Sequence, residues 1–198
     1  MQNLVVEKMK ENILNVQPEH DDDAMLMLKI AEGSEHALRM IIERWKNPLA
    51  NYFYRSISDI HTAEDLAQQT FINLYRAKES YTPSAKFSTY LFHIARNVLI
   101  NEYRKRQRRP FDPVDPVEIT SSVEGRTELT TNELEEVFYY TLEKLPENQR
   151  TAILLFKQQD MSYEEIAEAM NATIPAVKTW IFRARSVLKD ALKDTKHI

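Results

Sequence analysis

Side chains that can bind nucleic acid recur about once per helical turn in the middle of the sequence. They are Tyr90, His93, Asn97, Asn101 and Arg104. On an α-helix, this spacing places all five on one face. An aromatic ring can stack on a base, an amide can bond to a base edge, and a guanidinium can neutralise a phosphate. The face therefore suits single-stranded DNA, although a merely solvated helix face explains the pattern equally well.

Charge is strongly segregated along the chain. Residues 86–109 contain seven basic residues and one acidic residue, whereas residues 111–136 contain eight acidic residues and one arginine. From residue 174 to the end there are six basic and two acidic residues. The net charge of −4 hides this division. Two basic blocks around an acidic spacer indicate two nucleic-acid-binding parts.

A second candidate site follows a tight turn near the C-terminus. Residues 162–165 (Ser-Tyr-Glu-Glu) form a capping box that opens a short helix, and residues 171–173 (Asn-Ala-Thr) form a turn. Thr173 is expected to cap the next helix, with Pro175 in its first turn. The exposed side of that helix is expected to carry Lys178, Thr179, Phe182, Arg183, Arg185 and Lys189. The pattern indicates a DNA-binding helix-turn-helix; a two-helix corner with a solvated face is the alternative.

Helical periodicity dominates the elements that must position these residues, and no alternating strand pattern is present. The first helix is expected to follow Asp21-Asp22-Asp23 and to run to about Gly33. Ser34 is expected to cap the second helix, and Pro48 is expected to open the third. Thr62 is expected to cap the fourth helix, with Asp65 at the third position of that helix. The remaining helices are expected at about 88–108, up to 145, 146–158, 162–170, and from 173 onward.

The chain is expected to divide into two domains. Pro110, Pro113 and Pro116 interrupt the helical pattern and open an acidic stretch rich in Ser and Thr. The fold class predicted is all-α, with two small helical domains joined by an acidic flexible linker. The expected boundaries are 1–20 for an N-terminal extension, 21–109 for the first domain, 110–132 for the linker and 133–198 for the second domain.

Composition excludes several classes of site. The 198 residues include no cysteine, so there are no disulfides, thiolate zinc sites or iron–sulfur clusters, and two glycines are too few for the glycine-rich phosphate loops. The five histidines are widely spaced, and no nucleophile motif is present. We therefore expect no cofactor, no metal and no catalysis. No apolar run approaches a membrane span, so a cytoplasmic protein without membrane insertion is expected.

Several segments, in order, resemble the conserved regions of bacterial sigma factors. With only regions 2 and 4 and no region 3, the chain resembles the extracytoplasmic-function (ECF) group. The matching segments are Ala63 to Phe71 with Leu74 to Arg76 for region 2.2, Phe87 to Asn97 for regions 2.3 and 2.4, and Leu145 to Arg150, Val177 to Thr179 and Arg183 to Arg185 for region 4.

The resemblance implies three binding surfaces. The residues implied to bind core RNA polymerase are Asp65, Gln68, Gln69 and Ile72. Those implied to bind the −10 promoter element, with a base-accepting pocket in a loop from Phe87 to Tyr90, are Ser88, Thr89, Tyr90, His93, Asn97, Asn101, Arg104 and Lys105. Those implied to bind the −35 element are Thr173, Pro175, Lys178, Thr179, Arg183 and Arg185.

The resemblance also implies partners and a function. The chain would bind the β′ clamp helices and the β subunit of core RNA polymerase, recognise both promoter elements and help open the DNA. It would act as a monomer in the bacterial cytoplasm, where an anti-sigma factor would sequester it. Trp180, Phe182, Asn171 and Tyr90 depart from common family residues, which leaves the promoter sequence open.

Two other classes of binding protein remain as alternatives at this point. A conventional helix-turn-helix regulator would dimerise on palindromic duplex sites without docking on polymerase. That class does not explain the segment from Ala63 to Arg76. A helical adaptor that binds only protein would leave both basic blocks without a role.

Overall fold

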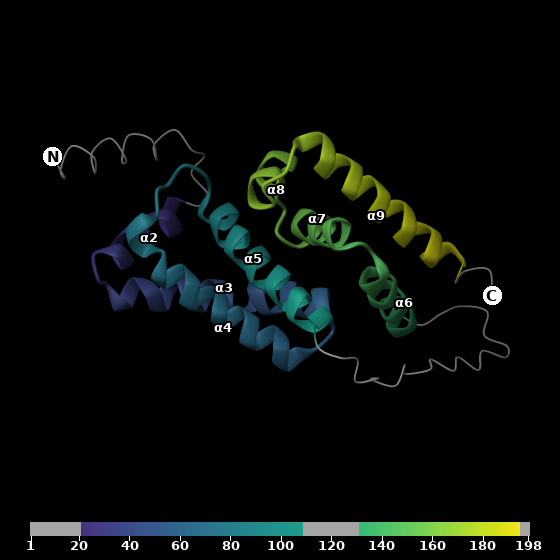
Figure 1. Cartoon of the computed structure of the whole chain (residues 1–198), viewed down its shortest axis with the longest axis horizontal. Helices are drawn as coiled ribbons and strands as arrows, with labels where there is room; N and C mark the ends of the chain where they lie inside the picture. The colour runs from purple at the N-terminus through teal and green to yellow at the C-terminus, as the bar shows by residue number, and fades with distance from the viewer. Residues whose placement is uncertain (1–20, 109–130, 195–198) are drawn as a thin grey trace.

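The computed structural model describes residues 21–108 and 131–194, and within these ranges all regular structure is helical. The predicted linker lies outside the described residues except for its last two positions, and residues 1–20 lie outside them too. Figure 1 shows the helices in two groups. The first group is α2 (Asp21–Ala31), α3 (Glu35–Ile57), α4 (Ile60–Arg76) and α5 (Phe87–Arg108), with the short 3₁₀ turn η2 (Lys78–Ser80). The second is α6 (Thr131–Lys144), α7 (Glu147–Gln158), α8 (Tyr163–Ala169) and α9 (Ile174–Asp194).

Helix α3 shows both a confirmed and a failed prediction. Ser34 caps it as expected, its hydroxyl accepting a hydrogen bond from the Ala37 N–H. Pro48, however, does not open a new helix, because α3 continues through it. A proline removes one backbone hydrogen bond and crowds the preceding turn. Trp45 and Leu49 are both buried at helical spacing around Pro48, so continuing the helix keeps one unbroken apolar face in the core.

Helix α4 begins earlier than its sequence pattern predicts. Asp59 rather than Thr62 is the N-cap, and its carboxylate accepts a hydrogen bond from the Thr62 N–H at 2.9 Å. That backbone hydrogen bond lowers the pKa of Asp59. The prediction was wrong because Asp59 stands three residues before Thr62 and is an equally good cap. Asp65 therefore lies in the second turn of α4 and not at its third position.

The core of the first group contains aromatic rings and one buried carboxylate, which pairs with an arginine at the surface. Trp45 lies against Phe87 and Phe92 at centroid distances of 6.1 and 6.0 Å. Asp23 is fully buried, where its carboxylate pairs with Arg44 and accepts a hydrogen bond from the Trp45 indole at 3.0 Å. A carboxylate buried among apolar groups requires such partners. Asp23 therefore joins α2 to α3.

The second group confirms the predicted helix-turn-helix. Ser162 and Glu165 form the capping box at the start of α8, with both reciprocal hydrogen bonds present. Asn171 adopts the left-handed conformation at φ 48°, which a tight turn requires and which Asn tolerates. Thr173 accepts a hydrogen bond from the Ala176 N–H at 3.4 Å, as expected for a cap. The apolar face of α9 is buried as predicted.

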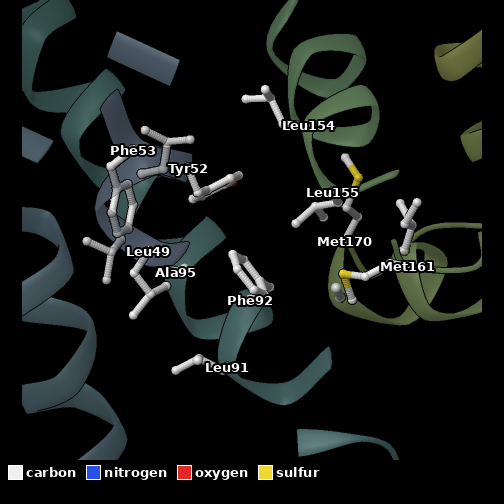
Figure 2. Packing of buried hydrophobic residues seen from close by; sticks show 14 of the residues in the cluster. Leu49, Tyr52, Phe53, Leu91, Phe92, Ala95, Leu154, Leu155, Met161 and Met170 are labelled. Carbon is white, nitrogen blue, oxygen red and sulfur yellow. The ribbon is translucent and has the colours of Figure 1, made fainter. Parts of the chain in front are cut away.

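One buried cluster runs through both groups of helices. Figure 2 shows Tyr52 and Phe92 on one side and Leu155, Met161 and Met170 on the other. All five are buried, and α8 packs on α5 while α6 and α7 pack on α3. Apolar burial is favourable wherever such faces meet. The two groups are therefore docked on each other in this structure.

Arg150 of α7 reinforces this docking with directional bonds. Its guanidinium donates to the backbone carbonyl of Ser56 at the end of α3 and to the hydroxyl of Tyr103 on α5. Tyr103 in turn donates to the same Ser56 carbonyl at 2.9 Å. The guanidinium also donates to the carbonyls of Glu143 and Leu145 within its own group. One side chain on α7 thus contacts α3, α5 and α6.

Within the described ranges, no helix combines the length and the apolar character needed to cross a membrane.

Candidate nucleic-acid and protein interfaces

The predicted −10 residues lie along helix α5, and the structure brings most of them to one side. Asn97, Asn101, Arg104 and Lys105 are exposed, while Tyr90 and His93 are half-buried. The Tyr90 ring packs on Tyr81 at a centroid distance of 4.9 Å. Burial of Tyr90 raises its pKa, so its hydroxyl stays protonated and able to donate a hydrogen bond.

The start of α5 differs from the predicted loop. Phe87 is the first helical residue, so Ser88 and Thr89 belong to the first turn of the helix. Both are buried, with 8% and 1% of their surface exposed. The Thr89 hydroxyl has no hydrogen-bond partner among the described residues. The expectation of a loop was wrong because Phe87 packs into the core against Trp45 and draws the chain into the helix.

Helix α8 covers part of this face. His93 and Asn97 are joined, with 3.2 Å between the histidine Nε2 and the amide nitrogen. On its other side, His93 Nδ1 lies 3.1 Å from the carbonyl oxygen of Ala169 on α8. A carbonyl only accepts hydrogen bonds, so Nδ1 carries the proton and Nε2 accepts from Asn97. The predicted −10 face is thus partly occupied by the helix-turn-helix.

An ion pair adds to the contact between α5 and α8. Lys86, just before α5, lies with its ammonium 2.8 Å from a carboxylate oxygen of Glu165. Burial alone would raise the pKa of Glu165, but the hydrogen bonds from Lys86 and from the Ser162 N–H outweigh it and lower the pKa overall. Glu165 therefore serves both the capping box and the docking of the two groups.

Helix α4 presents the residues predicted to bind polymerase on its solvent side. Asp65, Gln68, Gln69 and Ile72 are all exposed, and their spacing places them on one face. Ile72 is 45% exposed, which is high for a large apolar residue on a helix whose other face is in the core. Gln69 is held by a hydrogen bond with Asn73 at 2.9 Å. The face combines amides, one carboxylate and one apolar side chain.

The six predicted −35 residues on and before α9 are exposed, but they do not share one direction. Arg183 lines a cleft beside α5, whereas the Arg185 guanidinium lies 4.7 Å from the centre of the Phe156 ring on α7. The two positions are about 200° apart around a helix, so they face opposite sides. Lys178 lies 5.6 Å from the centre of the Tyr163 ring. The members, all exposed, are Thr173, Pro175, Lys178, Thr179, Arg183 and Arg185.

Phe182 is a feature of α9 that the predicted −35 set lacks. Its side chain is 73% exposed, more than any other large apolar side chain in the described part of the chain. It lies one turn from Lys178 on the outward face. The signal in the sequence is an aromatic residue off the apolar stripe of Val177, Ile181 and Ala184.

Within residues 21–108 and 131–194, no three His, Asp or Glu side chains come together as metal ligands.

Two family models match the chain. The model described as Sigma-70 region 2 matches residues 41–109, and the model described as Sigma-70, region 4 matches residues 135–188. The first range contains the exposed faces of α4 and α5. The second contains the helix-turn-helix.

Relatives and solved structures agree with these matches. The RNA polymerase sigma-H factor of Pseudomonas aeruginosa is 30% identical over 183 residues, covering 87% of this chain and 95% of the relative. The ECF RNA polymerase sigma-E factor of Escherichia coli K12 is 29% identical over 181 residues, covering 86% of this chain and 94% of the relative. The sigma factor RpoE of Bartonella quintana, solved with the anti-sigma factor NepR, aligns with a TM-score of 0.63 at 27% identity. That alignment covers 78% of this chain and 96% of the solved one.

A further structure, CnrH in complex with the cytosolic domain of CnrY, shares the fold with a TM-score of 0.67. It is 24% identical and covers 87% of this chain and 98% of the solved one. The exposed faces on α4, α5 and α9 thus lie in the segments that define regions 2 and 4. The chain belongs to the sigma-70 family of RNA polymerase sigma factors, in its extracytoplasmic-function group.

Proposed function

We propose that the two domains of this sigma factor, residues 21–109 and 133–198, bind different partners. Helix α4 binds core RNA polymerase, α5 recognises the −10 element, and α9 recognises the −35 element. The observation that carries the proposal is that polar, basic or apolar side chains remain exposed on all three helices, while the opposite face of each is buried. Such a protein acts in the bacterial cytoplasm, where core polymerase and promoters are found.

The proposed polymerase contact uses the exposed face of α4. Gln68 and Gln69 offer both donors and acceptors, and Asp65 offers a carboxylate. Ile72 supplies the apolar centre that protein interfaces commonly have. The partner surface is the β′ clamp helices, by the family resemblance, and the second domain makes a further contact with the β subunit.

The proposed −10 contact requires single-stranded DNA. A base must leave the duplex stack to be read, which costs a few kcal/mol and is repaid by stacking and hydrogen bonds. Tyr90 provides the aromatic surface, while Asn97 and Asn101 provide amides for base edges. Arg104 and Lys105 neutralise phosphates. Ser88 and Thr89 are buried in the first turn of α5, so their place in the −10 set is supported by the family resemblance alone.

The proposed −35 contact uses duplex DNA. The outward face of α9 enters the major groove, while Thr173 and Pro175 approach the backbone at its N-terminus. Lys178, Thr179 and Arg183 reach base edges or phosphates. Phe182 is added to this set, because an exposed aromatic ring can pack on a thymine methyl group.

The docked arrangement supports a requirement for polymerase. His93 cannot meet a flipped base while its ring is bonded to the Ala169 carbonyl, so α8 must leave α5 before the −10 element is read. Core polymerase would hold the two domains apart at promoter spacing. Linking two weak sites in this way raises the affinity without new contacts.

An anti-sigma factor is proposed as a second protein partner. The solved RpoE of Bartonella quintana is in complex with the anti-sigma factor NepR. An anti-sigma factor that bound this chain would compete with polymerase for one or both domains. The chain would then be kept inactive until the partner was released.

Run-off transcription with bacterial core polymerase tests the proposal. Adding the chain to core polymerase and a genomic library should produce transcripts that start at discrete sites. Gln68→Ala with Ile72→Ala should abolish them together with co-purification on core, whereas Asn51→Ala, an exposed amide on α3, should not. Tight binding of a homodimer to palindromic duplex DNA without polymerase would contradict the proposal and favour a helix-turn-helix regulator.

A further inference from the structure

A polar cleft lies between the two groups of helices, at one side of the surface on which they are docked. It has a volume of about 480 Å³ and lies between α5, the first turn of α7 and α9. Arg96 and Arg104 line it from α5, and Trp180 and Arg183 line it from α9. Small-molecule sites commonly have volumes of about 300–1,000 Å³. The cleft therefore has the size of a small-ligand site, and it exists because the two groups are docked.

The charge of the cleft is unbalanced. Three guanidinium groups line it, and Glu147 is the one carboxylate among the lining residues. None of the three arginines forms a salt bridge with another described residue, in contrast to Arg44 or Arg106. The Nε of Arg96 is buried and has no hydrogen-bond partner among the described residues. Converging unpaired guanidinium groups favour an anion that can accept several hydrogen bonds, as phosphate does.

The first turn of α7 adds to this preference. Glu147, Asn148 and Gln149 line the cleft, and Pro146, the N-cap, offers no side-chain hydrogen bond. The first N–H groups of a helix point outward and attract negative charge. The side-chain amides of Asn148 and Gln149 also supply donors and acceptors.

An aromatic ring distinguishes this cleft from a simple phosphate site. Trp180 is half-buried, with part of its ring packed on the core, and it lines the cleft together with Tyr103. Stacking of a base on an aromatic ring is favourable and tolerates any base, because every base has a flat π-face. An indole beside three guanidinium groups therefore matches a ligand that carries both a planar base and phosphates.

We propose that the cleft binds a nucleotide, with its phosphates on Arg96, Arg104 and Arg183 and its base on Trp180. The ligand would touch both groups of helices and so stabilise their docking. The effect of a bound nucleotide on transcription rests on the proposed function, because Arg104 and Arg183 are also assigned to the −10 and −35 elements. A bound nucleotide would hold both arginines away from promoter DNA.

Binding to the full chain is measured without polymerase or DNA, by calorimetry with ATP, GTP and inorganic tripolyphosphate. Fluorescence adds a local readout: Trp45 is 7% exposed, so quenching by the nucleotide reports mainly on Trp180. Arg183→Gln and Arg104→Gln should each weaken nucleotide binding about tenfold or more. Trp180→Leu should weaken it about fivefold, and Trp180→Phe should retain most of it. Arg39→Gln, an exposed arginine on α3 away from the cleft, is the matched control.

Three outcomes would overturn the proposal. The first is no heat and no quenching with either nucleotide. The second is tripolyphosphate binding as tightly as ATP with Trp180→Leu unaffected, which would leave an anion site without base recognition. The third is equal nucleotide binding by the wild type and Arg183→Gln, which would place the bound nucleotide outside the cleft. Because these assays contain no polymerase, their failure leaves the transcription assay of the proposed function unaffected.

Discussion

The ammonium of Lys86 lies 2.8 Å from Glu165, a residue 79 positions further along the chain. This pair connects the turn before α5 with the capping box of α8. A second contact between α5 and α8 joins His93 to the Ala169 carbonyl. Together the two contacts hold the helix-turn-helix against the face that is proposed to bind the −10 element. Under the proposed function, this contact must be released before the −10 element is read.

Replacing the lysine should change the titration of its partner. In Lys86→Gln the pKa of Glu165 is expected to rise, since the hydrogen bond and positive charge that lower it are lost. The Ser162 N–H remains, so part of the lowering should persist. Side-chain NMR across the acid range measures the value directly. Lys78→Gln, which removes a lysine that lies over the Tyr75 ring, is the control.

The same pair should make domain docking sensitive to acid. The pKa of Glu165 is lowered from 4.5, so its contribution to docking is complete above that value and is lost as pH falls through the lowered pKa. Energy transfer between dyes on α4 and α9 should decrease on acidification. The decrease in energy transfer on acidification should be smaller in the Glu165→Gln variant than in Glu164→Gln. Equal changes in both variants would show that another group controls the opening.

Loosening the docking should also change DNA binding by the free chain. The wild-type protein is expected to bind duplex promoter DNA weakly, because its domains are docked and polymerase is absent. Lys86→Gln should increase this binding, whereas its effect on transcription with core polymerase should be small. Electrophoretic mobility shifts at low ionic strength measure the difference. Tight, specific binding by the wild-type chain alone would contradict the expectation.

The buried carboxylate of Asp23 should matter for stability. Asp23→Ala leaves Arg44 without its partner and removes the acceptor of the Trp45 indole. Leaving the buried indole N–H without an acceptor costs about 1–3 kcal/mol, whereas the exposed Arg44 guanidinium can be hydrated. Asp22→Ala, at an exposed neighbouring position, should change the free energy of unfolding little. Urea denaturation followed by circular dichroism compares the two variants.

The two proposed DNA-binding helices should give different defects. Arg183→Ala or Lys178→Ala should weaken −35 binding by about 1–2 kcal/mol, whereas Lys193→Ala at the far end of α9 should not. Asn97→Ala should instead slow promoter opening about fivefold, because an amide bond to a flipped base is lost. Permanganate footprinting detects opening separately from binding. Unchanged opening in Asn97→Ala would show that this face of α5 is assigned wrongly.

Local sequence signals predicted most of the secondary structure. The Ser34 cap, the capping box of Ser162 and Glu165, and the left-handed Asn171 were recognisable because each depends on residues within one helical turn. The apolar stripe of α9 was predictable for the same reason. These signals, with the sigma-factor segments, were sufficient for the all-α class and for the family.

Contacts between distant residues were not predictable from those signals. Pro48 stays inside α3 because Trp45 and Leu49 are buried together, and Ser88 and Thr89 are buried because Phe87 enters the core. The sequence separation of the docking contacts is larger still, with 94 positions between Ser56 and Arg150. Periodicity reports which face of a helix is apolar, but it contains no information on which other helix covers that face. Packing of the complete chain decides that, and with it the docked state and its cleft.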